Sequence, residues 1–114
     1  MTGVSGPVTM INAFTVPPAE SERFLQRWLD NARIMAGQPG YLGAKLHRAL
    51  SDNAELRFVN VAQWASEESV RAATANPGWR RSMRRMLDDP ELHVTPRPAV
   101  YEVVAELHPG DAGL

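Results

Sequence analysis

Two asparagines interrupt strand-like apolar segments of this 114-residue chain. Side chains alternate along a strand, so Asn60 shares a face with Phe58, and Asn12 shares a face with Phe14. An amide on a buried face is costly unless it finds hydrogen-bond partners. The two amides therefore predict either a pocket with hydrogen-bond donors on its floor, or a pairing with backbone groups or with each other.

Aromatic residues near these amides could enclose a flat ligand. Trp64 shares the face of Asn60 and lies about 13 Å further along the strand, at ~3.3 Å per residue. Trp28 belongs to an apolar helical stripe, and Trp79 begins a second helical segment with apolar residues at helical spacing. The candidate walls of an aromatic site are Trp64, Trp28, Trp79, Phe24 and Phe58.

The histidines and the absence of cysteine exclude several kinds of chemistry. Without cysteine, the chain has no thiolate nucleophile and no Cys-ligated zinc or iron–sulfur centre. His47, His93 and His108 form no H-x-x-H or H-x-x-x-H pair, so a metal site of short spacing is not expected. The chain also has no Gly-rich phosphate loop and no nucleophile-elbow serine.

The charge pattern argues against nucleic acid and membrane as partners. The 12 Lys and Arg residues balance 13 Asp and Glu residues, for a net charge of −1, whereas both partners select a strongly basic surface. No signal peptide and no run of about 18 to 20 apolar residues is found, so a cytoplasmic location is expected. One run of arginines could form an anion site, and it comprises Arg80, Arg81, Arg84 and Arg85. On a helix, such a run more often forms a face exposed to solvent.

Periodicity and helix breakers predict one domain over residues 7–107, with flexible termini at 1–6 and 108–114. Ser66 is a good N-cap, and Pro77 interrupts the helix that follows it. The predicted order is strand 8–16, helix 20–35, strands 41–50 and 56–64, helical pieces 66–76 and 79–87, a loop over 88–98 and strand 99–107. This β-α-β-β-α-β order is the α+β, ferredoxin-like arrangement of a four-stranded sheet with helices on one face.

The other face of the predicted sheet has no cover of its own. It is not polar, because depending on the register it takes Ile11, Ala13, Val59 and Val61. A small domain gains stability by burying such a face against a partner. A homodimer that pairs sheet to sheet is therefore predicted.

The strand that contains Asn60 also carries a recognisable motif. Asn60-Val-Ala-Gln-Trp64-Ala-Ser66, followed by an acidic helix start, resembles the antibiotic biosynthesis monooxygenase family. The resemblance covers residues 7–107, and further segments share it in the same order. They are Pro7-Val-Thr-Met-Ile-Asn12-Ala-Phe, Gln38-Pro-Gly-Tyr-Leu42 with Leu46-His-Arg48, and Pro98-Ala-Val-Tyr101-Glu-Val.

This resemblance implies a dimeric α+β barrel and oxygenation by O₂ as co-substrate, without metal, flavin or other cofactor. The substrate in the branch that the chain resembles is an anthrone-type aromatic polyketide, which is converted to a quinone. The site residues of the family match Asn60 and Trp64, and Asn12 matches an asparagine that contributes in some members. A second-helix arginine of some members falls at Arg84 by ungapped spacing.

Two departures separate the chain from particular branches of the family. A tyrosine that one polyketide-oxidising branch places six residues after the strand tryptophan is Val70 here. The heme-degrading branch uses a first-strand asparagine, which Asn12 matches. It also uses a helical tryptophan and a histidine, whose positions fall at Ala73 and near Ser82. Productive heme degradation is therefore not expected.

Chemistry without a cofactor is feasible because a phenolic tricycle can supply the electrons itself. Its enolate can pass one electron to O₂, and the recombined hydroperoxide can lose water to leave a quinone. Asn60 and Asn12 can donate to the enolate oxygen, and Arg84 would add a charged donor if it points inward. Histidine is the residue type suited to a general base, and His47 is the only candidate nearby, although a structural role is expected for it. The alternatives are a stress-related, detoxifying or heme-degrading oxygenase and a non-catalytic binding or cyclase-like dimer.

Overall fold

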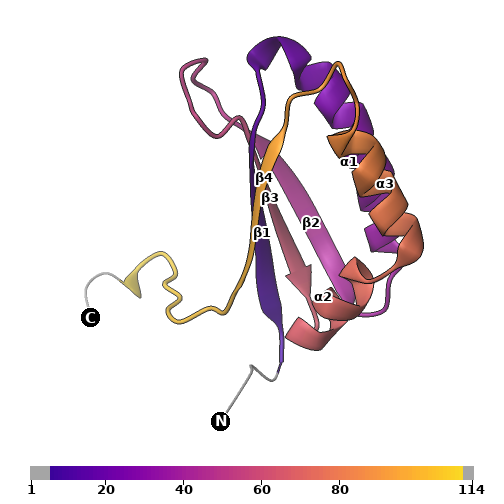
Figure 1. Cartoon of the computed structure of the whole chain (residues 1–114). Helices are drawn as coiled ribbons and strands as arrows, with labels where there is room; N and C mark the ends of the chain where they lie inside the picture. Colours follow the sequence, from indigo (N-terminus) through magenta and orange to yellow (C-terminus); the bar gives the residue numbers. More distant parts are fainter. Residues whose placement is uncertain (1–5, 112–114) are drawn as a thin grey trace.

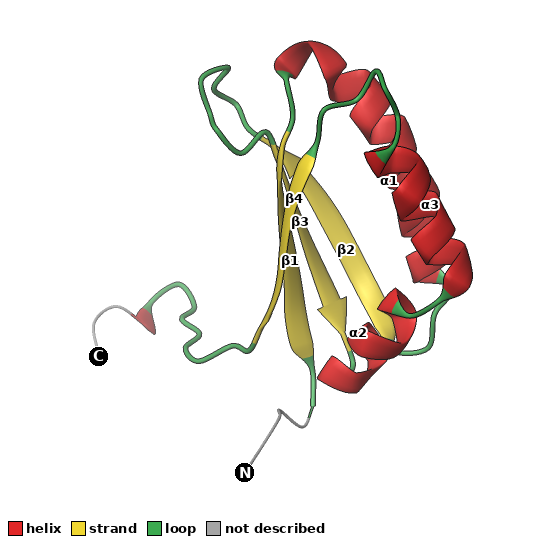
Figure 2. Cartoon of the chain, in the orientation of Figure 1, coloured by secondary structure: helices red, strands yellow, loops and turns green. Residues whose placement is uncertain are grey.

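The chain folds into two layers, a four-stranded sheet and a layer of helices on one of its faces (Figures 1 and 2). The computed structural model describes residues 6–111, so the terminal residues 1–5 and 112–114, predicted to be flexible, lie outside the described residues. The strand order is β2-β3-β1-β4, with antiparallel neighbours throughout. The predicted ferredoxin-like α+β fold is confirmed. The strands are β1 (Val8–Thr15), β2 (Tyr41–Arg48), β3 (Phe58–Trp64) and β4 (Thr95–Tyr101).

Two of the helices begin at a residue whose side chain caps the first turn. The Ser66 side chain accepts a hydrogen bond from the backbone N–H of Ser69 at 3.0 Å, and Asn76 accepts one from Trp79 at 3.0 Å. Pro77 is the first residue of its helix, where a missing N–H does no harm, so this helix begins two residues before the predicted start. The helices are the short 3-10 helix η1 (Pro18–Glu20), α1 (Ser21–Ala36), α2 (Glu67–Thr74) and α3 (Pro77–Leu87).

The last strand differs from its prediction at both ends. β4 begins at Thr95, inside the segment predicted as a loop, and ends at Tyr101 instead of residue 107. Pro96 and Pro98 are tolerated because β4 is an edge strand, and one of its sides needs no hydrogen-bond donors. After Tyr101 the chain leaves the sheet, and residues 102–110 are exposed (Figure 1).

A bulge in β2 brings two of its residues to the same face of the sheet. Tyr41 pairs with Trp64, but Gly43 pairs with Gln63, so the register shifts by one residue. Gly43 has a φ of 146°, a conformation that other residues rarely adopt. As a result, both Tyr41 and Ala44 face the helices, which strict alternation would not allow.

The core fills the space between the sheet and the helices in two clusters. The first contains Val8, Met35, Ala62, Trp64, Val70 and Ala73, and the second contains Phe14, Val16, Phe24, Phe58, Met86 and Leu92. The described helices all lie on one side of the sheet (Figure 2). On the other side, the outer face, the half-buried residues include Ile11, Ala13, Val59 and Val61. Among the described residues, no helix is long and apolar enough to cross a membrane.

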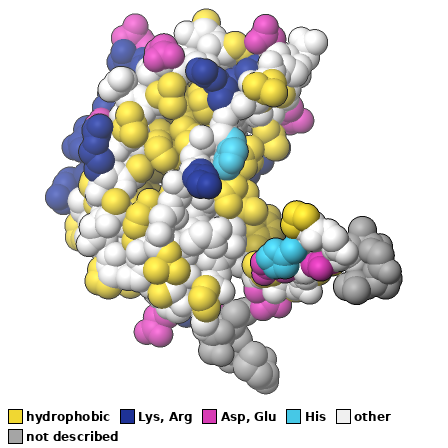
Figure 3. Space-filling view, turned by 180° about the vertical axis from the view of Figure 1, so that it is seen from behind, with side chains coloured by type: hydrophobic (Ala, Val, Ile, Leu, Met, Phe, Trp, Pro, Cys, Tyr) yellow, Lys and Arg dark blue, Asp and Glu magenta, His cyan; other side chains and the backbone are white. Residues whose placement is uncertain are grey.

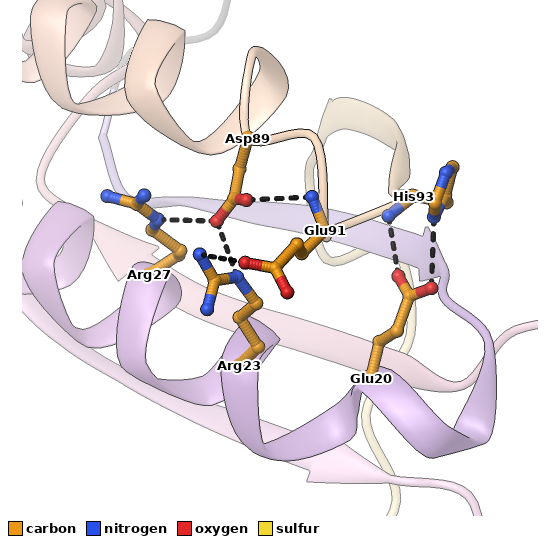
Figure 4. Close-up of polar contacts among 6 residues, drawn as sticks. All are labelled: Glu20, Arg23, Arg27, Asp89, Glu91 and His93. Atoms are coloured by element: carbon orange, nitrogen blue, oxygen red, sulfur yellow. Dashed lines mark hydrogen bonds and ion pairs between the residues drawn. The ribbon is translucent and has the colours of Figure 1, made fainter.

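A cluster of ion pairs ties α1 to the loop after α3 (Figure 4). The buried Asp89 carboxylate accepts hydrogen bonds from Arg23 Nε at 2.7 Å, from Arg27 Nε at 3.1 Å and from the backbone N–H of Glu91 at 2.9 Å. These contacts, with Arg23 the strongest, lower the pKa of Asp89 from 3.8 to about 2. The cluster fixes the position of α1 against the end of α3.

Candidate active site

An apolar cavity lies between the sheet and the helices, lined from β1, β2, β3, α1 and α3. Its volume is about 60 Å³, which is room for a few water molecules. Sites that hold drug-sized ligands are larger, about 300–1,000 Å³. A flat aromatic ligand therefore needs side chains to move, and flexible thioethers suit that purpose. The methionines of the lining are Met10, Met35, Met83 and Met86.

Two side chains of β3 line this cavity with polar atoms that have no partner. Asn60 is 8% exposed and Trp64 is 1% exposed. The Asn60 Oδ1 and the Trp64 Nε1 are buried and make no hydrogen bond within the described part of the chain. A buried polar atom left unpaired costs about 1–3 kcal/mol, and native proteins keep few of them. A ligand in the cavity would give both side chains the partner that the protein does not provide.

Asn12 lies directly across from Asn60 on β1 and lines the same cavity. Its Oδ1 accepts a hydrogen bond from the backbone N–H of Arg97 at 3.0 Å. The interpretation that an amide pairs with the backbone therefore holds for the Asn12 carbonyl, and the NH₂ group is the part left to meet a ligand. The Asn60 carbonyl has no such partner among the described residues.

The aromatic residues divide between the cavity and the core. Trp28 of α1 and Trp79 of α3 line the cavity on the side of the helices. Phe24 and Phe58 do not line it, contrary to the expectation that they enclose a ligand. Both are fully buried in the second core cluster, with ring centroids 4.6 Å apart and planes 23° apart. Both rings are fully used in core packing. Hydrophobic periodicity shows that a side chain points inward, but it does not show whether that side chain packs in the core or lines a cavity.

Arg84 and His47 lie outside the cavity. Arg84 is exposed beside three other arginines, because Met83 and Met86 take the inward face of α3. His47 is exposed on the outer face of β2, where its Nδ1 lies 3.2 Å from the carbonyl oxygen of Val59. Neither side chain is placed to act on a ligand in this cavity.

Three residues around the cavity are not indicated by the sequence patterns. Tyr41 packs edge-on against Trp64, with ring centroids 5.3 Å apart, and the bulge in β2 hides its place on that face. Asn31 of α1 is buried and lines the cavity, and the buried Ser82 hydroxyl of α3 donates to its Oδ1. One feature of the sequence could have indicated Asn31: it follows Trp28 by three residues, so a polar side chain lies within the apolar stripe of the helix.

The chemistry of the lining is that of neutral hydrogen-bond donors. The described residues that line the cavity include no Asp, Glu, His, Lys or Arg. Within residues 6–111, no three His, Cys, Asp or Glu side chains gather as a potential metal site. Amides, an indole N–H and a phenol can stabilise an oxygen anion, but amides and indole cannot accept a proton near neutral pH. Such donors come from Asn12, Asn31, Asn60, Trp64 and Tyr41.

These features define a ferredoxin-like α+β protein whose apolar cavity presents an unpaired amide oxygen and an unpaired indole N–H from a central strand. The family model for antibiotic biosynthesis monooxygenase matches residues 7–85. The chain belongs to this family, which confirms the assignment made from its motifs.

Relatives of known activity fall into two kinds. Deoxynogalonate monooxygenase of Streptomyces nogalater is 39% identical over 75 residues, which cover 63% of this chain and 58% of that enzyme. Heme oxygenase (mycobilin-producing) of Mycobacterium tuberculosis is 32% identical over 71 residues, which cover 62% of this chain and 66% of that enzyme. The matched segments thus span less than two thirds of each relative's length.

A solved structure extends the similarity over most of the fold. The crystal structure of SnoaB, a cofactor-independent oxygenase from Streptomyces nogalater, superposes with a TM-score of 0.72 at 28% identity. The match covers 90% of this chain and 97% of SnoaB. Membership of a family of oxygenases supports the expectation that the chain is an oxidoreductase.

Proposed function

We propose that this protein is a cofactor-independent monooxygenase that converts an anthrone-type or related phenolic aromatic to a quinone with O₂. The observation that carries the proposal is a pair of unpaired atoms on β3 in an otherwise apolar cavity: the Asn60 Oδ1, which can accept from a phenol O–H, and the Trp64 Nε1, which can donate to an enolate oxygen. Similarity to deoxynogalonate monooxygenase and to SnoaB supports the same reaction class.

The electrons for the reaction come from the substrate. Loss of a proton from the benzylic CH₂ group next to the aromatic rings gives an enolate, whose negative charge rests largely on oxygen. The enolate passes one electron to O₂, and the resulting radical and superoxide combine to form a C–O bond. Protonation of the resulting peroxide anion gives a hydroperoxide. The carbon then loses its remaining proton, the O–O bond breaks, and water leaves, so that a carbonyl group remains. One O₂ is consumed, with one oxygen atom in the quinone and one in water.

The protein contributes binding and charge stabilisation. N–H donors from Asn60 and Trp64 stabilise the enolate oxygen, and the effect is strong because the cavity is apolar and excludes bulk water. Asn12 adds its NH₂ group from the neighbouring strand. Trp28 and Trp79 hold the aromatic rings from the side of the helices.

The proton acceptor in this scheme is water. The described lining contains no carboxylate, imidazole or amine, and His47 lies on the outer face of the sheet. The donors therefore act by lowering the pKa of the substrate C–H, and the proton passes to water in the cavity. This assignment replaces His47 as a candidate base.

The direct test is oxygen uptake with a dihydroxyanthrone, using protein treated with EDTA and shown to contain no flavin. We expect consumption of one O₂ per quinone formed, with no added metal or reductant. Binding of the anthrone without O₂ uptake above the uncatalysed rate would instead mean a non-catalytic binding or cyclase-like protein.

A homodimer is part of the proposal. The outer face of the sheet carries no described helix, its central strands place Ile11, Ala13, Val59 and Val61 there, and residues 102–110 stand apart from the body (Figures 1 and 3). Val103, Val104 and Leu107 in that segment are 70%, 86% and 76% exposed. Exposed apolar surface of this kind is typical of an interface, and a second copy would complete a dimeric α+β barrel. Sedimentation at micromolar concentration should show a dimer, and a 12.6 kDa species would contradict it.

Heme degradation is the second candidate, because a heme oxygenase is among the relatives. The positions at which that branch carries its tryptophan and histidine hold Ala73, which is buried in the first core cluster, and Ser82, which hydrogen-bonds Asn31. The described cavity lining also contains no histidine. We expect heme with ascorbate to give no open-chain tetrapyrrole, and formation of one would favour this candidate over anthrone oxidation.

A further inference from the structure

The side of the cavity formed by the helices contains a buried amide with an unusual set of partners. Asn31 of α1 is 5% exposed and lines the cavity. Its Oδ1 accepts a hydrogen bond from the hydroxyl of Ser82 on α3. Its Nδ2 lies 3.1 Å from the sulfur of Met83 and 3.6 Å from the sulfur of Met86.

These contacts fix the orientation of the amide. A thioether sulfur can accept a hydrogen bond but cannot donate one, so the NH₂ group and not the carbonyl must face the two methionines. The Ser82 hydroxyl, which can donate or accept, then donates to the carbonyl and anchors the amide to α3. Asn31 is therefore an oriented donor in the lining of the cavity.

The donor capacity of Asn31 is poorly used in the absence of a ligand. Thioether sulfur is a weak acceptor, whereas a ketone or phenolate oxygen is a strong one. Met83 is partly exposed and has a flexible side chain, so a ligand oxygen can take its place beside Nδ2. The small volume of the cavity requires some side chain to move when an aromatic ligand enters, and Met83 lies in the lining.

We propose that Asn31 is a ligand-binding and specificity-determining residue, which donates a hydrogen bond to an oxygen of the bound aromatic. Asn60 and Trp64 donate from the sheet, while Asn31 donates from the helices, so the cavity selects aromatics that carry oxygen at two or more positions. Ser82 is a positioning residue, since its hydrogen bond to the carbonyl holds the amide in place against α3. The choice of an aromatic ligand rests on the proposed function, but the inference about Asn31 concerns binding alone.

Binding measurements with two probes test this assignment. The probes are 1,8-dihydroxyanthraquinone, which has oxygen at several positions, and anthracene, which has none. Quenching of tryptophan fluorescence reports binding, because Trp28, Trp64 and Trp79 all line the cavity. Asn31→Ala should weaken dihydroxyanthraquinone binding by about tenfold relative to its effect on anthracene, the scale of one hydrogen bond.

Two further variants separate donation from packing. Ser82→Ala, which removes the hydrogen bond that anchors the amide to α3, should reduce the preference for dihydroxyanthraquinone by a smaller factor. Asn53→Ala, at an exposed turn position, is the matched asparagine control and should leave both affinities unchanged. If Asn31→Ala does not fold, Asn31→Leu combined with Ser82→Ala removes both partners at once, which proteins tolerate better than an orphaned group.

The outcomes distinguish this inference from the proposed function. An equal change in the affinities for the two probes would show that Asn31 only packs α1 against α3, and would overturn the inference even if the wild type oxidises anthrones. A selective loss of dihydroxyanthraquinone binding supports the inference even if the wild type consumes no O₂. In that second case the monooxygenase proposal fails and the role of Asn31 stands.

Discussion

Asn60→Ala separates a catalytic amide from a structural one. In the structure the Asn60 carbonyl has no hydrogen-bond partner among the described residues, so its removal leaves no protein group unpaired. Loss of the unpaired atom offsets the loss of packing contacts, and the free energy of unfolding should change by no more than about 1 kcal/mol. For a domain of 114 residues that corresponds to a change in melting temperature of about 4 °C.

The effect on turnover should be much larger. If the Asn60 amide donates to the developing enolate oxygen, its loss removes one donor of an oxyanion site in an apolar cavity. Such a donor typically contributes about 10²–10³-fold in kcat. Asn60→Ala should therefore lower anthrone oxidation by at least about 10²-fold while the protein stays folded.

Asn12→Ala is the matched control, because Asn12 is the asparagine directly across the sheet. Its carbonyl holds the backbone N–H of Arg97, so its loss should cost about 0.5–1.5 kcal/mol of stability and affect turnover less. Melting temperature and quinone formation, measured for both variants, give two independent readouts. A destabilised Asn60→Ala with normal turnover per folded molecule would refute the assignment, because it would mean that the amide is part of the scaffold.

Trp64→Phe should lower kcat/KM by about tenfold, because the indole donor is lost while an aromatic ring remains; unchanged kinetics would contradict a role for the N–H. His47→Ala and Arg84→Ala should leave anthrone oxidation at the wild-type rate, since both side chains lie outside the cavity, and a large loss in either would place the site elsewhere. Asp89→Asn should reduce the loss in the free energy of unfolding that occurs as the pH falls through the acid range. The pKa of Asp89 is about 2 in the folded protein against an ordinary 3.8, so its pairing stabilises the fold above pH 3.8 and is lost as the pH falls toward 2. Acid unfolding curves that coincide for the two proteins would argue against this linkage.

Local sequence signals predicted most of the fold because each acts over a few residues. The predicted cap Ser66 bonds the first turn of its helix, and alternation in β3 placed Asn60 and Trp64 on one face of the sheet. Asn76, predicted as the end of the preceding helical piece, instead caps α3. The error at β4 has a different origin. Prolines usually indicate a loop, but an edge strand tolerates them, and whether a strand lies at an edge depends on the whole sheet.

The cavity lining was harder to predict, because it depends on which inward-facing side chains leave space between them and which pack against one another completely. Phe24 and Trp28 share one helical stripe, yet the first is core and the second lines the cavity. Tyr41 reaches the cavity only through the bulge at Gly43, which shifts the register of β2. Asn31 lies among apolar residues and pairs with a serine 51 positions away in the chain, a contact that no local pattern encodes.

The two walls of the cavity differ in how firmly they are held, and this difference bears on specificity. Asn60 and Trp64 belong to β3, which is hydrogen-bonded on both sides by β1 and β2, so the donors that would meet the enolate are fixed by the sheet. The opposite wall includes Met83 and Met86, which can change conformation without breaking a strand ladder. Widening of the cavity should therefore occur on the side of the helices. Substrates of different outline can then be accommodated there, while the oxygen that carries the developing charge keeps the same position against β3.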